Sequence, residues 1–316
     1  MLVSYGPDVD LQRRISEGRG EFLLFALTPP RQTASPEQAQ EIADNTAKRL
    51  QPLGVDGLIL YDIDDESDRN PEERPFPFLP TMDPANYLSR YFNTWNTPVV
   101  VYRAVGKYAE SDLEAWLRAQ EPDRRLSVFV GSVSRDKRVA TSLGRAQTLR
   151  AQTRPDLLLG GVAIPERHAR NGDEHLRLLR KQAAGCSFFV TQVVYDVNAA
   201  KNLVSDYRYE CLAQGVTPAP IVFTFSVCGS MKTLEFLRWL GVDVPRWIEN
   251  ELLHADDTLE ASFEYALAAA RELITYCRRL GVPFGLNVES VSIRRAEIEA
   301  SVDLAGHLRD ELHRPD

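Results

Sequence analysis

A glutamate, Glu289, ends the apolar run 283–288 near the C-terminus of this 316-residue chain. A carboxyl at the end of a buried strand faces a partly desolvated pocket, which raises its pKa and suits it to proton donation. Pairing with Arg294 or Arg295 is an alternative interpretation that fits the sequence equally well. Other polar side chains lie near the ends of the apolar runs, among them Thr224 in the run 220–225 and Asn287 in the run 283–288.

An acidic loop, 62–68, follows the apolar run 57–61 and begins with Asp62. Its carboxylates could supply oxygen ligands to a divalent cation. The loop lacks the glycine and the spacing of an EF-hand, so a solvated loop is the simpler interpretation.

The five histidines and four cysteines show no metal-ligand spacing. His168 lies alone in the segment 165–170, so we expect no multi-histidine metal centre and no metal ligand. The cysteines lack CxxC spacing, which predicts buried, reduced thiols in the cytoplasm. There is no GxSxG segment, and nucleophilic acyl chemistry therefore has no support.

The elements that must position these groups are eight short apolar runs separated by helical patterns. The runs are continuous rather than alternating, as expected of parallel strands covered on both faces. They lie at 21–27, 57–61, 98–103, 126–131, 156–163, 187–192, 220–225 and 283–288. Helices are predicted at 36–51, 83–95, 111–119, 142–152, 173–185, 198–214, within 231–280, and at 293–313.

Eight strand–helix units predict one (β/α)8 barrel, in which functional groups gather at the carboxyl ends of the strands. The expected division is an N-terminal extension, 1–19, followed by the barrel, 20–313. A doubly wound sheet is the structural alternative. No GxGxxG follows a strand and no GxxxxGK[ST] occurs, so the common dinucleotide and P-loop signatures are missing.

Composition and charge argue against a disordered chain, a nucleic-acid binder and a membrane protein. Hydrophobic residues make up 44% and charged residues 26%, which suits a folded globular chain rather than a disordered one. The net charge of −8 gives no basic face, so we expect no nucleic-acid partner. No apolar stretch approaches a membrane span and the N-terminus has no signal-like apolar core, so we expect a cytoplasmic protein without a membrane partner.

Three segments around the fifth and sixth runs resemble the methylenetetrahydrofolate reductase family. They are Gly160-Gly-Val-Ala-Ile-Pro-Glu-Arg-His168, Leu179-Arg-Lys-Gln-Ala-Ala-Gly-Cys186 and Phe189-Val-Thr-Gln-Val-Val-Tyr-Asp196. The opening Phe25-x-x-x-Pro-Pro-Arg31 and the segment 244–247 agree as well, and the resemblance extends over about 20–300. The family's fold is a (β/α)8 barrel.

The resemblance implies reduction of 5,10-methylenetetrahydrofolate to 5-methyltetrahydrofolate by NAD(P)H through FAD. On matching positions it implies substrate contacts for Gln192, Tyr195 and Phe236. Gln192 would also contact the nicotinamide and is a catalytic candidate. It implies FAD contacts for three further residues, namely Tyr61, His168 and Lys181. Whether the chain forms a homo-oligomer is left open.

The sequence departs from the family where acids are expected. The family's strand-one glutamate, which donates a proton to the folate, is replaced by Ala26. The loop after the fourth run reads Val130-Gly-Ser-Val133 in place of Arg-Gly-Asp, and Ile164 replaces a tyrosine. Loss of a general acid costs about 10²–10⁴ in rate.

Three hypotheses follow from these departures. In the first, Glu289 or Asp62 has taken over the role of the missing acid. In the second, the chain processes a folate one-carbon unit by another route, as a variant reductase without flavin, a lyase or a methyltransferase. In the third, it binds folate without catalysis as a partner subunit.

Overall fold

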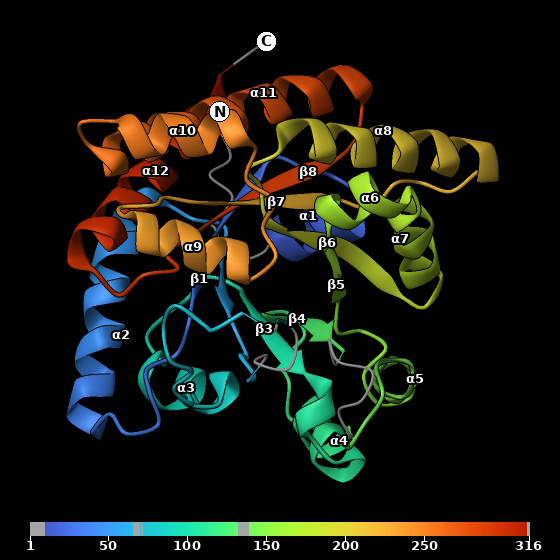
Figure 1. Cartoon of the computed structure of the whole chain (residues 1–316). Coiled ribbons are helices and arrows are strands. Elements are labelled where there is room, and N and C mark those ends of the chain that lie inside the picture. The colour runs from blue at the N-terminus through green and yellow to red at the C-terminus, as the bar shows by residue number, and fades with distance from the viewer. Residues whose placement is uncertain (1–9, 66–69, 71, 132–138, 315–316) are drawn as a thin grey trace, which may run out of the picture.

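The computed structural model describes residues 10–65, 70, 72–131 and 139–314. Eight parallel strands close into a barrel in which each strand pairs with the next and β8 pairs with β1 (Figure 1). This closure confirms the single (β/α)8 barrel and excludes the doubly wound sheet. The strands are β1 (Phe22–Leu27), β2 (Gly57–Leu60), β3 (Val99–Ala104), β4 (Arg125–Val130), β5 (Leu159–Ala163), β6 (Cys186–Val193), β7 (Ile221–Ser226) and β8 (Phe284–Glu289).

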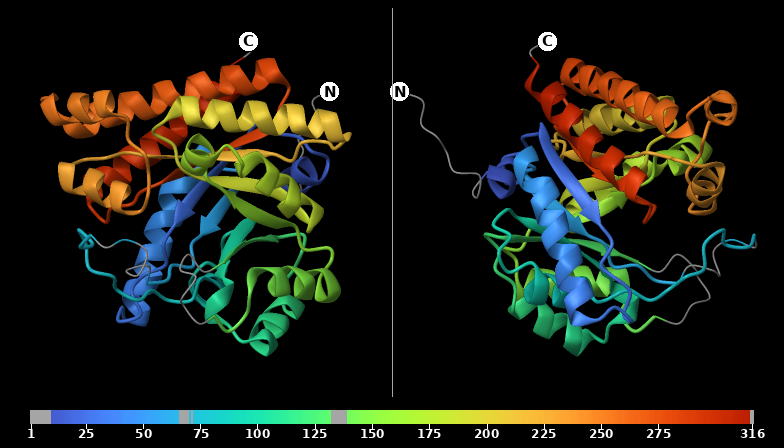
Figure 2. Two further views of the ribbon diagram at one scale, coloured as in Figure 1. Left: turned by 45° about the vertical axis from the view of Figure 1, so that its right-hand side comes forward. Right: turned by 90° about the vertical axis from the view of Figure 1, so that its left-hand side faces the viewer.

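Helices surround the strands, as Figure 2 shows from two further sides. They include α2 (Pro36–Leu50), α3 (Pro84–Tyr91), α4 (Glu110–Arg118), α5 (Leu143–Thr153), α6 (Pro165–Asn171), α7 (Glu174–Ala183), α8 (Val197–Gln214), α9 (Met231–Trp239), α10 (Arg246–His254), α11 (Thr258–Leu280) and α12 (Arg295–His313), with short 3-10 turns η2 (Gln51–Leu53) and η4 (Val105–Lys107). At the start of α2, the Ser35 side chain caps the helix and Pro36 occupies its first turn, as the sequence predicts.

The barrel interior is a packed core. Inward-facing side chains from the strands form one apolar cluster, which includes Phe22, Val128 and Phe188. Two glycines make room for these rings: a Cβ at Gly160 would lie 2.6 Å from Phe188, and one at Gly285 would lie 2.4 Å from Phe22. The larger cluster lies between the strands and the helices.

The segment before β1 contributes to this interior. Helix α1 (Asp10–Ser16) lies within the predicted N-terminal extension and buries Leu11 and Ile15 in the same cluster as Phe22. A Cβ on Gly57, the first residue of β2, would lie 2.9 Å from Leu11, so α1 covers the amino ends of the strands. The opposite, carboxyl end of the barrel is where functional side chains are expected.

The region between β7 and β8 is divided into α9, α10 and α11 rather than being one long helix. Trp239 and Leu252 pack inside, whereas Trp247 and Leu253 remain 60% and 53% exposed. No helix in the described part of the chain is long and apolar enough to cross a membrane.

Candidate functional site at the carboxyl ends of the strands

The strand register brings Glu289 beside the position where the resemblance expects a glutamate. Ala26 on β1 is the register partner of Glu289 on β8. Paired residues of neighbouring strands direct their side chains to the same face of a sheet. Ala26 belongs to the interior cluster, so the Glu289 carboxyl occupies the barrel mouth one strand away from Ala26.

Glu289 is bound by a tyrosine rather than by an arginine. The Tyr61 hydroxyl donates a hydrogen bond to Glu289 Oε2, and the Tyr61 ring makes an edge contact with Tyr102 at 4.9 Å. The two arginines considered as alternative partners pair elsewhere, Arg294 with Glu297 and Arg295 with Glu299. Burial raises the pKa of Glu289 to about 7, and the hydrogen bond from Tyr61 opposes this rise.

Two further polar side chains continue this row into the barrel. Asn287 Nδ2 lies 3.2 Å from Thr224 Oγ1 and 3.4 Å from the Tyr61 hydroxyl. Asn287 is fully buried, and its Oδ1 has no hydrogen-bond partner among the described residues. The row therefore brings a carboxyl with a raised pKa, a hydroxyl and an amide oxygen without a hydrogen-bond partner in the described residues to the same interior face.

Asp62, the second candidate acid, lies in a different environment. Its carboxylate accepts hydrogen bonds from Lys107 Nζ, from the Tyr108 hydroxyl at 2.8 Å and from the Ala104 backbone N–H at 2.9 Å. The Tyr108 hydroxyl oxygen also lies 3.0 Å from Oδ2 of Asp83, the N-cap of α3. These hydrogen bonds tie the loop after β2 to the loop after β3.

The structure describes only part of the acidic loop. Asp64 and Asp65 are described, whereas Glu66 and Asp68 lie outside the described residues. The altered loop after β4 also lies outside them from residue 132 onward.

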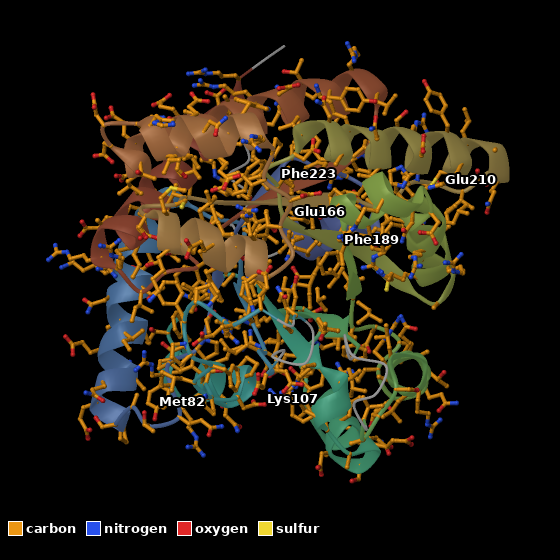
Figure 3. All side chains as sticks on the ribbon, in the orientation of Figure 1. Met82, Lys107, Glu166, Phe189, Glu210 and Phe223 are labelled. Carbon is orange, nitrogen blue, oxygen red and sulfur yellow. The ribbon has the colours of Figure 1, made fainter. Side chains whose placement is uncertain are left out.

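Glu166 is a third carboxyl that follows a strand and is buried. It lies at the start of α6, directly after β5, and is 2% exposed. Its Oε2 has no hydrogen-bond partner in the described part of the chain, and burial raises its pKa to about 7. Figure 3 shows Glu166 well apart from Lys107, which lies in η4 and binds Asp62, so Glu166 and the Asp62 group are separate.

Gln192 and Tyr195, which the resemblance assigns to substrate, follow each other on β6 and the turn after it. Gln192 is half-buried, and its Nε2 donates to Leu240 O at 2.9 Å. Tyr195 is 2% exposed and stacks on Tyr265 at 5.8 Å, inside the cluster under α9, α10 and α11. Gln192 is therefore the more accessible of the two.

The predicted stacking residue Phe236 is covered by the segment that follows β2. Phe76 contacts its ring edge-on at 5.4 Å, and the Arg74 guanidinium lies 5.2 Å from its ring centre. The Trp239 indole N–H donates to Glu72 O at 2.9 Å and holds this segment on α9. Figure 2 shows the segment and α9 on the same side of the molecule. A ligand that stacks on Phe236 must displace Phe76 or Arg74.

The three residues predicted to contact FAD do not converge on one surface. Tyr61 faces the barrel interior and binds Glu289. His168 is 5% exposed, and its Nε2 lies 3.1 Å from Asp206 on α8. Lys181 donates to Val162 O behind β5 and lies 4.0 Å from Glu174, and its burial lowers its pKa. In this structure the three side chains therefore have separate protein partners.

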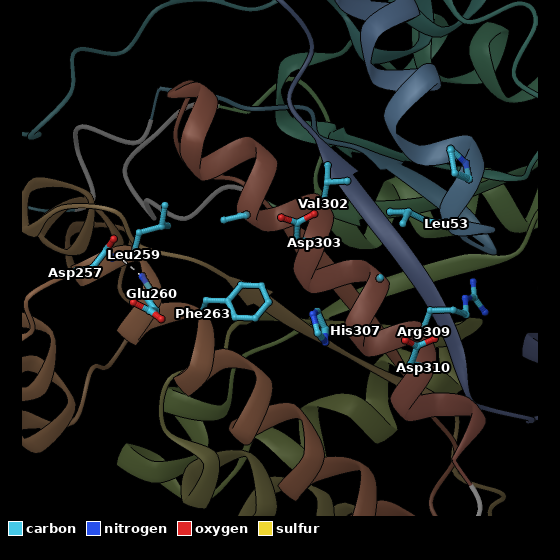
Figure 4. Close-up of a pocket in the computed structure, with 13 residues that line it drawn as sticks. Leu53, Asp257, Leu259, Glu260, Phe263, Val302, Asp303, His307, Arg309 and Asp310 are labelled. Atoms are coloured by element: carbon cyan, nitrogen blue, oxygen red, sulfur yellow. Dashed lines mark hydrogen bonds between the residues drawn. The ribbon is translucent and has the colours of Figure 1, made fainter.

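A pocket of about 710 Å³ lies elsewhere, between η2, α11 and α12 (Figure 4). Phe263 and His307 form part of its wall, with four acidic residues around them. None of the residues predicted to contact substrate or cofactor lines it, and it lies on the outer helix layer. It is therefore separate from the carboxyl-end site.

Sequence reasoning anticipated Glu289, Asn287 and Thr224 as strand-end residues but did not identify Tyr102. Tyr102 is two residues before the end of β3 and faces inward like Val100, so alternation along the strand is the signal that could have found it.

Comparisons with known proteins place the chain among folate-related proteins. The family model for methylenetetrahydrofolate reductase matches residues 135–290. A solved structure from Clostridium thermocellum, described as binding two copies of 5-methyl-5,6,7,8-tetrahydrofolic acid, is 39% identical with a TM-score of 0.84; the match covers 95% of this chain and 99% of that one. A xylanase from Caldicellulosiruptor owensensis is 8% identical at a TM-score of 0.48, covering 89% and 88%, and is too distant to inform function. A search of curated proteins gives no match.

Proposed function

Because the chain belongs to the methylenetetrahydrofolate reductase family, we propose that it reduces 5,10-methylenetetrahydrofolate to 5-methyltetrahydrofolate with NAD(P)H, using Glu289 as the proton donor. The observation that carries the proposal is the pairing of Glu289 with Ala26, the position of the missing family glutamate. A pKa of about 7 lets Glu289 carry its proton at neutral pH and release it to substrate.

The proposed reaction needs one proton and one hydride. The Glu289 carboxyl protonates N10 of the folate as the bond between N10 and the methylene carbon breaks, which leaves an iminium at N5. NAD(P)H supplies the hydride to the methylene carbon and leaves as NAD(P)⁺, and a solvent proton restores Glu289. The Tyr61 hydroxyl orients the carboxyl during this cycle.

The other predicted contacts would orient the folate. Gln192 Nε2 is held by Leu240 O, so its amide is fixed in direction at the edge of the mouth. Phe236 would stack on the pterin or nicotinamide ring after Phe76 or Arg74 moves away. Tyr195 would act behind Gln192, because it is buried under α9 to α11.

We route no step through FAD, because Tyr61, His168 and Lys181 point to separate surroundings. The visible spectrum of the purified protein tests this point. A flavin band near about 450 nm that copurifies with the protein would show that FAD is retained.

The test of the reaction is NADH or NADPH oxidation that depends on methylenetetrahydrofolate, with 5-methyltetrahydrofolate identified by mass spectrometry. We expect turnover by the unmodified protein. Folate binding without any oxidation of either dinucleotide would refute the reductase proposal.

A folate-binding protein without catalysis is the second candidate. The replacement of the family glutamate by Ala26 favours it, as does the folate bound by the C. thermocellum protein. It predicts that calorimetry detects 5-methyltetrahydrofolate binding and that Glu289→Gln leaves this affinity within a few fold.

We also propose that the reaction takes place in the cytoplasm, because the four cysteines are buried free thiols, which is typical of a reducing compartment. A homo-oligomer could use exposed apolar side chains such as Trp247 and Leu253 on α10.

A further inference from the structure

A group of two histidines and one aspartate lies in the helix layer, outside the carboxyl-end site. His168 on α6, His175 on α7 and Asp206 on α8 each offer a ligand atom, and these three atoms lie within 4.8 Å of one another. The two imidazole rings meet edge to face with their centres 5.3 Å apart. His168 Nε2 and Asp206 Oδ2 are 3.1 Å apart.

The chain between the histidines explains why the sequence did not reveal this group. In a continuous helix, residues seven apart lie about 10 Å apart along the axis. Here α6 ends at Asn171, and Gly172 takes a left-handed conformation with φ of +69°. This turn starts α7 in a new direction and brings His175 against His168. Seven-residue spacing across a helix break matches no common metal motif.

Both histidines retain unused binding capacity. His168 Nδ1 and His175 Nδ1 are buried without a hydrogen-bond partner in the described residues. The Asp206 side chain is 55% exposed and provides both a negative charge and a route from solvent.

We propose that His168, His175 and Asp206 form a binding site for a divalent first-row metal ion of the zinc type, with one coordination position left to water. Two nitrogens and a carboxylate oxygen are ligands that such ions accept. Ligand atoms around a tetrahedral zinc lie about 3.4 Å apart. The observed separations are at most 4.8 Å, and that between His168 Nε2 and Asp206 Oδ2 is already 3.1 Å, so binding requires the ligand atoms to close by at most about 1.4 Å.

A bound ion would join α6, α7 and α8. These helices follow β5 and β6, whose carboxyl ends carry Glu166 and Gln192. The site is therefore suited to stabilising this side of the barrel, and its binding does not depend on whether the folate reaction occurs.

The test uses the whole protein freed of metal by chelation. Calorimetric titration with Zn²⁺ should give one ion per chain with micromolar or tighter affinity, and Co²⁺ should give the visible absorption of a tetrahedral site. Saturating Zn²⁺ should raise the thermal midpoint by a few degrees.

Three variants keep the test decisive. His175→Ala and Asp206→Asn change partly or fully exposed residues and should fold, and each should weaken Zn²⁺ binding at least about tenfold. His254→Ala, an exposed histidine on α10, is the matched control and should bind like the unmodified protein. Absence of binding at millimolar Zn²⁺, or equal affinity in His175→Ala and the unmodified protein, would overturn the proposal.

Discussion

Replacing Glu289 with glutamine should lower turnover and raise stability at the same time. Glutamine keeps the size of the side chain and can still accept a hydrogen bond from Tyr61. It cannot donate the proton, so the turnover number should fall by about 10²–10⁴. In the unmodified protein, turnover should decline above about pH 7, where Glu289 loses its proton.

The stability effect follows from the raised pKa. Between pH 4.5 and about 7 the unfolded chain ionises Glu289 while the folded chain keeps it protonated, so the free energy of unfolding falls as the pH rises through this window. The fall is at most about 3 kcal/mol. Glu289→Gln has no such loss, so it should exceed the unmodified protein in stability at pH 8 by up to that amount and by much less at pH 4.5.

Urea unfolding at pH 4.5 and pH 8 measures this difference. Glu166→Gln is the matched control, because burial raises the pKa of Glu166 to about 7 as well, without contact to Tyr61. The control should show the same pH-dependent gain in stability with turnover unchanged within a few fold. The reasoning fails if Glu289→Gln changes the free energy of unfolding equally at both pH values, or if only Glu166→Gln abolishes turnover.

Two further predictions concern the neighbours of the proposed acid. Tyr61→Phe removes the hydrogen bond that favours the ionised form of Glu289, so the alkaline decline of the pH–rate profile should move to higher pH. An unchanged profile would argue against contact between Tyr61 and Glu289 in solution. Asp62→Asn weakens the hydrogen bonds that Asp62 accepts from Lys107 and Tyr108. Urea titrations should therefore show a free energy of unfolding lower by about 1–3 kcal/mol, while the pH–rate profile keeps its shape. Loss of turnover in a stably folded Asp62→Asn protein would instead identify Asp62 as the donor.

Much of the architecture could be predicted from the sequence because both faces of a barrel strand are buried. The run 57–61 and β2 differ by a single residue, and Ser35-Pro36 marks the start of α2 as predicted. The prediction was less complete between β7 and β8, where Gly241, Pro245 and the cap Asp257 divide one helical region into three helices. It also missed α6, although Pro165 stands at its first turn.

The contacts of the candidate site could not be predicted in the same way, because they depend on barrel closure. Tyr61 and Glu289 are 228 residues apart and come from strands that both flank β1. No local pattern specifies that contact; it follows only when β8 pairs with β1 in the observed register. The seven-residue separation of His168 and His175 was equally uninformative without the turn at Gly172.

The pairing of β1 with β8 explains how a carboxyl on β8 can serve the same part of the barrel mouth as a carboxyl on β1. Residues paired across neighbouring parallel strands share a face and lie about 5 Å apart. A carboxyl at 289 therefore reaches much of the volume that a carboxyl at 26 would occupy, while Ala26 leaves that volume open. Because Tyr61 approaches from the other side of β1, it can direct the Glu289 carboxyl over Ala26. If this is the basis of activity, Ala26→Glu should place two carboxyls together, raise the pKa of one of them further, and move the alkaline limb of the pH–rate profile upward.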